Sequence, residues 1–345
     1  MPAMLVYAGI DEAGYGPMFG PLVIGRMVLG VEASDHGDGA KPSATAPQPD
    51  LWRLLSKVVC REIGKIKKGR THRLAVNDSK KIHSQSSGIK HLELGVLAFA
   101  GLADKHPSDV CQWLDVLGER SHHDLNALPW YAADDRAPWQ TLPCTVSAGE
   151  AAISRAMLAA EAKTRGVRTL DFGAAVVFED RFNRMVAATR SKASASFTFV
   201  AGHLQHIWEQ FGTQRPVVAV DRQSGRMHYR ELLAMTFPDA HITIEREGDV
   251  ASVYQLVQTR PVPRAMSVRF EVQAEQDHMP VALASMISKY TRELLMARFQ
   301  NWFTHHAPTI KPTAGYATDA KRFWQEIQPI LPELAIQPGQ IQRMC

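Results

Sequence analysis

Residues 5–29 read LVYAGIDEAGYGPMFGPLVIGRMVL, and this stretch decides the fold that the sequence predicts. Residues 5–10 form a short apolar run with β-branched and aromatic members, which is typical of a buried strand. Residues 21–29 predict a second strand after a turn rich in Gly and Pro. Asp11 and Glu12 are therefore expected where the first strand ends.

Two adjacent acids at the mouth of a buried strand are unfavourable unless a positive charge compensates them, and a bound divalent cation is the usual compensation. Gly14, Gly16 and Gly20 permit a positive φ or a close approach of another backbone, so the turn after the acids suits a bulky neighbour. The alternative interpretation is a surface hairpin whose acids are solvated. A strand, an acid pair, three glycines and two prolines together favour a functional site.

The composition is that of an ordinary soluble globular protein, with 345 residues, 45% hydrophobic and 21% charged side chains. This length allows one elaborated domain or two small ones. The net charge of +4 and the isoelectric point of about 8.8 permit a polyanionic partner without demanding one.

The cysteines indicate a reducing compartment, because they are few, far apart and without CxxC spacing. They are Cys60, Cys111, Cys144 and Cys345. The acid motif begins about ten residues after Met1, which leaves no room for a signal peptide, and no apolar run approaches the roughly 20 residues of a membrane span. We expect a cytoplasmic protein that does not bind membranes, and nothing in the sequence implies a protein partner.

Several further elements follow from periodicity. Residues 33–50 lack periodicity and predict an inserted loop, whereas residues 51–66 have helical spacing and predict an amphipathic helix that ends near Gly69 with a basic outer side. Further helices are predicted over 90–103 and 148–165, and strands over 169–179, 240–247 and 265–272.

Residues 76–83, VNDSKKIH, form a second block with chemical meaning. Asp78 and Ser79 are suited to cap a helix start. Lys80 and Lys81 present two flexible ammonium groups that suit phosphate oxygens. A lone pair of lysines is most often a solvated surface feature, so this block gains weight only from its neighbours.

Two later blocks bring further acids. Residues 216–221, PVVAVD, predict a buried strand that ends at Asp221. Residues 275–296, EQDHMPVALASMISKYTRELLM, predict a buried helix from about Pro280, preceded by the acids Glu275 and Asp277.

In this order the blocks resemble the type 2 ribonucleases H, the ribonuclease HII and HIII family. AGIDEAGYGPMFGPLVIG is similar to the family's opening motif, and DSKK to its second motif. The helix that carries Ser285, Lys289 and Arg292 resembles the family's AASIxAKxxRD helix, with Glu293 where Asp is usual. Residues 314–318, AGYAT, resemble the family's GYGT segment at Tyr316.

The resemblance implies a ribonuclease H-like α/β fold, with a mixed five-stranded sheet flanked by helices and a helical C-terminal part. The catalytic domain is expected over 1–300, with a loop insertion at 33–50 and a variable insertion at about 104–147. The helical extension is expected over 301–345 and contributes to the substrate site.

The resemblance also implies a site for two divalent ions, Mg²⁺ or Mn²⁺, held by carboxylates. Its expected ligands are Asp11, Glu12, Asp221 and Glu275, with Asp277 as the alternative to Glu275. Glu275 stands at the family's distance from Ser285, whereas Asp277 needs a shortened loop. The expected substrate contacts are Gly14, Tyr15, Gly16, Ser79, Lys80, Lys81, Lys289 and Tyr316.

The implied activity is hydrolysis of the RNA strand of RNA/DNA hybrids, or of DNA that contains ribonucleotides, leaving 5′-phosphate and 3′-hydroxyl ends. Tyr15 departs from the family, which has Arg or Lys there, and Arg222 replaces a usual Gly. Because a tyrosine cannot replace a cation, preference for a single embedded ribonucleotide is open, as is the choice between HII-like and HIII-like specificity. The alternatives are a non-catalytic nucleic-acid-binding relative and a nuclease of this fold that acts on DNA.

Overall fold

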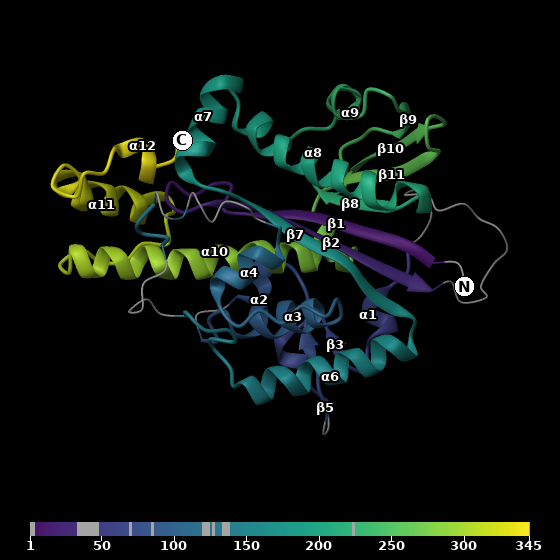
Figure 1. Cartoon of the computed structure of the whole chain (residues 1–345), viewed down its shortest axis with the longest axis horizontal. Coiled ribbons are helices and arrows are strands. Elements are labelled where there is room, and N and C mark those ends of the chain that lie inside the picture. Colours follow the sequence, from purple (N-terminus) through teal and green to yellow (C-terminus); the bar gives the residue numbers. More distant parts are fainter. Residues whose placement is uncertain are drawn as a thin grey trace.

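The computed structural model describes residues 4–32, 48–68, 71–83, 86–118, 125, 128–132, 139–222 and 225–344. At its centre is a seven-stranded sheet with the strand order β7-β2-β1-β8-β11-β10-β9 (Figure 1). Its strands are β1 (Met4–Ala13), β2 (Leu22–Glu32), β7 (Val167–Val177), β8 (Val217–Asp221), β9 (His241–Arg246), β10 (Ala251–Gln258) and β11 (Arg264–Glu271). Two short pairs lie outside this sheet: β3 (Val59–Cys60) with β6 (Leu74–Ala75), and β4 (Lys67–Lys68) with β5 (Thr71–His72).

The sheet confirms the expected mixed α/β class, although it has seven strands instead of five. Strand β1 pairs antiparallel with β2 and parallel with β8, and β8 pairs parallel with β11. Strands β9, β10 and β11 form an antiparallel meander that enlarges the sheet. The residue pattern predicted strands at β9 and β11 but not at β10 between them.

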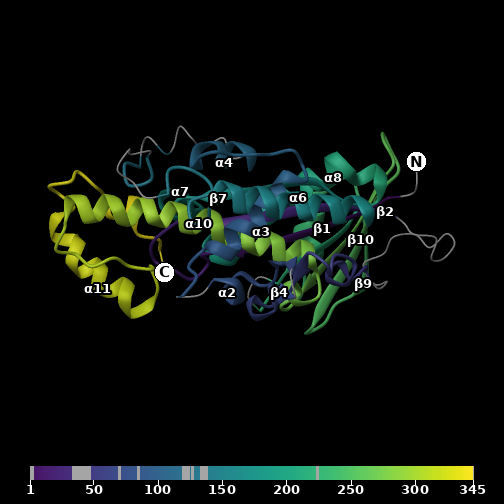
Figure 2. The same ribbon diagram turned by 90° about the horizontal axis from the view of Figure 1, so that it is seen from below.

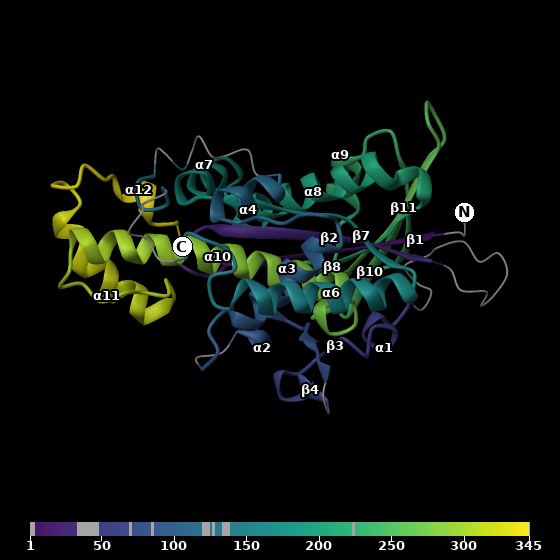
Figure 3. The ribbon, with the colours of Figure 1, turned by 60° about the horizontal axis from the view of Figure 1, so that its bottom comes forward.

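Helices cover both faces of the sheet. On one side lie α10 (Met279–His306), α3 (Lys90–Gly101) and α6 (Ala148–Thr164), and on the other lie α8 (Lys192–Phe211) and α9 (Arg230–Thr236) (Figures 1 and 3). The other helices are α1 (Leu51–Leu54), α2 (Ser79–Ile82), α4 (Val110–Val116), α7 (Glu179–Thr189), α11 (Ala317–Ile327) and α12 (Pro338–Ile341). Short 3-10 turns are η1 (Ile63–Lys65), η2 (Gly212–Gln214), η3 (Ala274–Gln276) and η4 (Gln328–Ile330).

Alternation along β1 divides its side chains between two cores. Val6, Ala8 and Ile10 pack into the core that α8 shares, whereas Tyr7 packs into the core that α10 shares. Gly9 and Gly25 face α10, where a Cβ would come within 2.2 Å of the Pro280 backbone and 2.6 Å of the Ala284 carbonyl oxygen. These two glycines let α10 lie against the strands that carry the acid motif.

The helix predicted over 51–66 is wrong beyond its first turn. Helix α1 begins after Asp50, whose side chain accepts a hydrogen bond from the Arg53 backbone N–H, and it ends at Leu54. The chain then enters β3, which pairs in parallel with β6. The β-branched Val58 and Val59 are buried, so tertiary pairing overrides the helical spacing of the apolar residues.

Most of the remaining predicted elements are confirmed within a few residues. They are α3 for 90–103, α6 for 148–165, β7 for 169–179, β8 for 216–221 and α10 for the helix from Pro280. The loop predicted over 33–50 lies, for residues 33–47, outside the described residues. Within the insertion at 104–147, Trp113 is fully buried and donates a hydrogen bond to Thr291 at 3.0 Å, so this part packs on α10.

The C-terminal helices α11 and α12 lie near one end of α10 (Figures 1 and 2). Helix α10 continues to His306 and so crosses residue 301, where the helical extension was expected to start. The division into a catalytic domain and a C-terminal extension stays a prediction. None of the helices within the described ranges combines the length and the hydrophobicity that a membrane crossing requires.

Candidate active site

The sheet brings the acid-bearing ends of β1 and β8 together. These strands run parallel, and Ile10 is the register partner of Val220, so Asp11 and Asp221 follow side by side at the same edge of the sheet. Strand β11 ends at the same edge, because Glu271 is the register partner of Asp221. Turn η3 follows β11 and carries Glu275.

Asp11 is buried, with 9% of its surface exposed. Burial, and next the charge of Asp221, raises the pKa of Asp11 well above its usual value, against a hydrogen bond from Ser285 that lowers it. The Glu12 backbone N–H also donates to an Asp11 carboxylate oxygen at 2.6 Å. These two hydrogen bonds stabilise the carboxylate less than burial and the charge of Asp221 destabilise it, so the pKa of Asp11 is raised.

Asp221 and Glu275 form a carboxyl–carboxylate pair joined by a side-chain hydrogen bond. Burial, and next the charge of Glu275, raises the pKa of Asp221 to about 7. The pKa of Glu275 is also raised, first by burial and then by the charge of Asp78. The Ala274 backbone N–H donates to Asp221 at 3.0 Å and fixes the turn that carries Glu275 against β8.

The two candidates for the last acid differ in position. Glu275 is buried and contacts Asp221, whereas Asp277 is exposed at the end of η3. Glu12 is partly buried at the rim, and its charge raises the pKa values of both Asp11 and Asp221. The structure therefore gathers Asp11, Glu12, Asp221 and Glu275, and places Asp277 outside this group.

Asp78 is an acid of this site that the sequence analysis assigned only to helix capping. It does cap α2, by accepting a hydrogen bond from the Lys80 backbone N–H, but its charge also acts on Glu275. Its place in the same short block as Lys80 and Lys81 was the available signal.

The predicted cations lie in two different environments. Lys80 and Lys81 are exposed on α2, and Lys81 lowers the pKa of Glu275 against the dominant effect of burial. Lys289 is mostly buried and pairs with Glu293 at 2.5 Å on α10. Lys80 and Lys81 thus have ammonium groups accessible to a phosphate, whereas Lys289 is engaged in an ion pair.

Two glycines in the turn after the acids differ in conformation and in the space around them. Gly14 has φ +87°, and a Cβ there would come within 2.7 Å of the Pro21 carbonyl oxygen. Gly16 is exposed, and a Cβ there would have open space around it. Tyr15 between them is partly buried against the α8 core, and burial, and next Glu12, raises its pKa while Arg226 lowers it.

Residues far apart in the chain hold this turn in place. Arg292, 1% exposed, donates to the carbonyl oxygens of Phe19 at 2.8 Å and Pro21 at 2.6 Å. The fully buried Glu179 accepts from the Gly20 backbone N–H at 2.9 Å. Near the C-terminus, the Arg343 side chain donates to the Pro17 carbonyl.

Glu179 and Arg343 carry no motif and were missed by the sequence analysis. Their contacts are with backbone atoms of the turn, and such contacts leave no pattern in a sequence. The only signal for Glu179 was its position two residues after the apolar strand β7.

The remaining predicted residues differ in their distance from the acids. The Ser285 hydroxyl donates to Ser79 at 3.0 Å and also bonds to Asp11, so Ser79 supports the acid group through Ser285. Tyr316 precedes α11 and is 45% exposed. The adjacent Gly315 accepts a hydrogen bond from the Met18 backbone N–H at 2.7 Å, which ties this segment to the glycine turn.

Within the described ranges, no group of three or more His, Cys, Asp or Glu side chains is arranged so that it could hold a metal ion. Asp221 and Glu275 instead form a pair joined by a side-chain hydrogen bond. The donor set is nevertheless of one kind, carboxylate oxygen, which is the chemistry that Mg²⁺ and Mn²⁺ prefer. Raised pKa values on both Asp11 and Asp221 mark a position where added positive charge is stabilising.

Comparison with known proteins gives similarity at the level of solved structures alone. No family model matches the chain, and no curated protein matches it. The chain is similar to ribonuclease HII in its complex with PCNA from Archaeoglobus fulgidus, at 17% identity and a TM-score of 0.41, over 99% of this chain and 94% of that one. It is similar to ribonuclease H2 from Pyrococcus horikoshii OT3, at 14% identity and a TM-score of 0.42, over 98% of this chain and 92% of that one.

A third similar structure is Bst-RNase HIII in complex with Mn²⁺, at 13% identity and a TM-score of 0.40, over 99% of this chain and 67% of that one. All three are ribonucleases of the type whose motifs the sequence resembles. At these identities and scores the similarity says nothing of activity, which rests on the residues of the site.

Proposed function

We propose that the chain is a metal-dependent endoribonuclease of the type 2 ribonuclease H kind, which hydrolyses the RNA strand of RNA/DNA hybrids and leaves 5′-phosphate and 3′-hydroxyl ends. The observation that carries the proposal is the gathering of Asp11, Asp221 and Glu275, whose pKa values are all raised. Buried carboxylates that repel one another are unfavourable for folding and are typical of functional sites.

The acids fit divalent ions by their chemistry. Asp11, Glu12, Asp221 and Glu275 would hold Mg²⁺ or Mn²⁺, whose positive charge would offset the repulsion between Asp221 and Glu275. When bound, two such ions would activate a water, stabilise the phosphorus oxygens and assist the leaving 3′ oxygen.

The chain's own residues supply binding and orientation. Lys80 and Lys81 are exposed at the start of α2 and would neutralise phosphates of the substrate strand. The turn at Gly14–Gly16 would place its backbone against the strand near the cleaved bond, because Gly16 leaves open space there. Ser285 also hydrogen-bonds to Asp11 and would help to orient that carboxylate.

Tyr15 bears on which substrate is preferred. A phenol lacks the positive charge that Arg or Lys provides, and the pKa of Tyr15 is raised, so the side chain is neutral at physiological pH. We expect a uniform RNA/DNA hybrid to be cleaved at least as well as a DNA duplex with one ribonucleotide. A contribution of Tyr316 to sugar packing is part of the same proposal, since its ring is 45% exposed.

The test compares the parent protein with Asp11→Asn on both duplexes in Mg²⁺ and in Mn²⁺. The amide removes one charge from the acid group, and we expect cleavage to fall by about a thousandfold. Glu209→Gln, an exposed acid on α8, is the matched control and should cleave like the parent. Equal rates for parent and Asp11→Asn would contradict the assignment of the site.

A second pair of variants separates the two candidate acids. Glu275→Gln should lower the rate by a factor of about a hundred or more, because its carboxylate lies against Asp221. Asp277→Asn should lower it by less than about tenfold, because its carboxylate is exposed beyond the group. The reverse order would assign the role to Asp277.

A non-catalytic nucleic-acid-binding protein is the second candidate, and two observations favour it. Tyr15 replaces a cation, and no three acids of the described residues are arranged for a metal ion. Tight binding of the hybrid without cleavage in either metal would establish this candidate. Cleavage of DNA alone would instead indicate a DNA-directed nuclease.

A further inference from the structure

One face of α6 lines a groove and has no element of the described structure packed over it. The residues of this face that line the groove recur at helical spacing: Glu150, Ile153, Ser154, Met157, Ala160, Glu161 and Thr164. Few α6 side chains are buried, among them Leu158 and Ala162 on a different face, and the helix packs on α3. A stripe of this length runs for roughly 20 Å along the helix.

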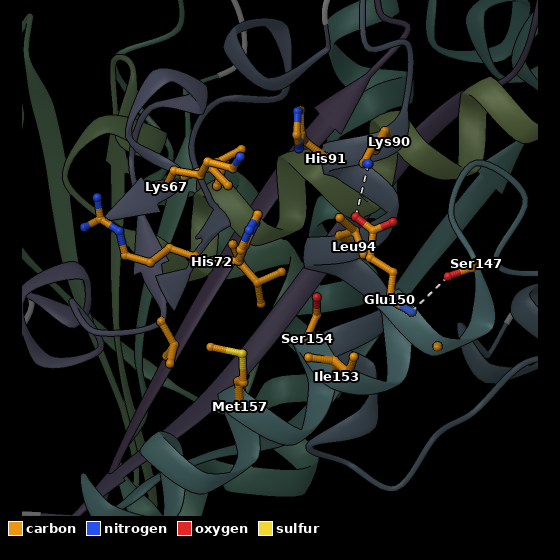
Figure 4. Close-up of a pocket in the computed structure, with 16 residues that line it drawn as sticks. Lys67, His72, Lys90, His91, Leu94, Ser147, Glu150, Ile153, Ser154 and Met157 are labelled. Carbon is orange, nitrogen blue, oxygen red and sulfur yellow. Dashed lines mark hydrogen bonds and ion pairs between the residues drawn. The ribbon is translucent and has the colours of Figure 1, made fainter. Parts of the chain in front are cut away.

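The groove consists of two adjoining hollows of about 790 Å³ and about 610 Å³. Both are lined by Val58 and Met157, so they meet at the middle of α6. Figure 4 shows the larger hollow, with Ile153, Ser154 and Met157 of α6 on one side and Lys67 and His72 across from them. A small ligand would fill one hollow, whereas the joined shape suits an elongated occupant.

The lining is apolar at its centre. Ile153 is 64% exposed, and Val58, Leu74 and Leu94 also line the larger hollow. An exposed β-branched side chain that lines an apolar hollow is typical of a protein-binding surface. Nucleic acid, whose outer surface is phosphate, would leave this apolar stripe without a partner.

Charge along the groove is asymmetric. On α6, Glu150 pairs with Lys90 at 3.0 Å near one end, and Glu161 pairs with Lys57 at 3.8 Å near the other. The wall across from α6 carries Lys67, which is exposed and has no ion-pair partner among the described residues.

His72 and Arg73 lie on the same wall as Lys67. The uncompensated charge of the groove is therefore positive, and it is located on the side away from α6.

We propose that this groove binds an amphipathic helical segment of a partner protein. The segment carries apolar side chains at i, i+3 or i+4 and i+7 against Ile153 and Met157, and carboxylates on the flank that faces Lys67. This is the helix-in-groove mode of recognition, with charge complementarity setting the orientation. The inference does not depend on the proposed nuclease activity.

The test is a selection from a display library of random 16-residue peptides, with the full chain as target. Selected peptides should be acidic, with apolar residues at helical spacing. Ile153→Glu should weaken their binding by about tenfold or more, since it removes apolar contact and adds a repelling charge. Lys67→Glu should weaken it by about threefold to tenfold, with a reduced dependence on salt.

Two control variants match these changes outside the groove. Met235→Glu places the same charge at an 80% exposed apolar residue on α9, and Lys105→Glu reverses an exposed charge after α3. Both should bind the selected peptides like the parent. Hybrid cleavage should be unchanged in all four variants, so a failure here and a failure of the proposed function are distinguishable.

Four outcomes would overturn the inference. Peptides that bind the parent and Ile153→Glu equally well would show that they contact another surface, and selection of basic or purely apolar peptides would contradict the charge argument. A parent that self-associates in light scattering, and becomes monomeric with Ile153→Glu, would identify a second copy of the chain as the occupant. Displacement of the peptides by a DNA duplex of no related sequence would identify a polyanion site.

Discussion

Asp221 and Glu271 are register partners at the same edge of the sheet, yet their surroundings differ in charge. Burial, and next Glu275, raises the pKa of Asp221 to about 7. Burial also acts to raise the pKa of Glu271, but hydrogen bonds from His278 and Arg269 lower it to about 2. Glu271 is compensated by two basic side chains of the chain, whereas the side chain that pairs with Asp221 is another acid, Glu275.

Glu93 is a buried acid whose charge is compensated by many hydrogen-bond donors of the chain. It is completely buried on α3 and accepts hydrogen bonds from the backbone N–H and thiol of Cys144, the backbone N–H and hydroxyl of Thr145, and the hydroxyl of Tyr290. Buried acids in this fold therefore differ in role according to their partners. Acids with donors join parts of the fold, whereas acids facing acids are available to a cation.

The largest expected effect on stability comes from removing the charge of Glu93, an acid that its hydrogen-bond donors compensate. Glu93→Gln places an NH₂ group among five donors, so we expect the free energy of unfolding to fall by about 3 kcal/mol. Urea denaturation at pH 7 measures it, with the exposed Glu209→Gln as control. A loss below about 0.5 kcal/mol would contradict the role of Glu93 in joining residues 144–145 to α3 and α10.

Replacing either register partner should change the free energy of unfolding by about 2 kcal/mol, and the two changes should depend on pH in opposite directions. The pKa of Glu271 is lowered in the fold, so its contribution is present above the unfolded pKa and is lost as the pH falls toward about 2. Glu271→Gln should therefore be less stable than the parent at pH 7 and approach it at low pH.

For Asp221 the sign is reversed. Its pKa is raised in the fold, so ionisation becomes increasingly unfavourable as the pH rises from about 4 toward about 7. Asp221→Asn should be more stable than the parent by an amount that grows over this window and then levels off. Denaturation curves between pH 4 and pH 8 measure both variants, and parallel profiles would refute the contrast.

The smallest expected effect is stabilisation by metal. Mn²⁺ at ten times its dissociation constant should stabilise the parent by about 1.4 kcal/mol, because it binds only the folded site. Asp221→Asn and Asp11→Asn should lose most of this gain, whereas Glu93→Gln and Glu271→Gln should keep it. A thermal melt with and without Mn²⁺ measures it, and equal shifts in all five proteins would locate the ion elsewhere.

The local residue pattern was sufficient to predict those elements that are stabilised by residues close to them in the chain. The apolar run before Asp11, the turn glycines, the Asp78 cap and the strand that ends at Asp221 are legible in the sequence because each depends on neighbours in the chain. The helix expected over 51–66 fails for the converse reason. Its residues after Leu54 are stabilised by β6, which lies outside that window.

The sequence by itself determined the mixed α/β fold, the blocks of acids and lysines, and the absence of a cation at Tyr15. Tertiary structure decided the rest: that Glu275 and not Asp277 lies against Asp221, that Asp78 joins them, and that Glu179 and Arg343 hold the glycine turn. The physical reason is range. Capping and alternation act over a few residues, whereas charge coupling and buried hydrogen bonds join groups that only folding brings together.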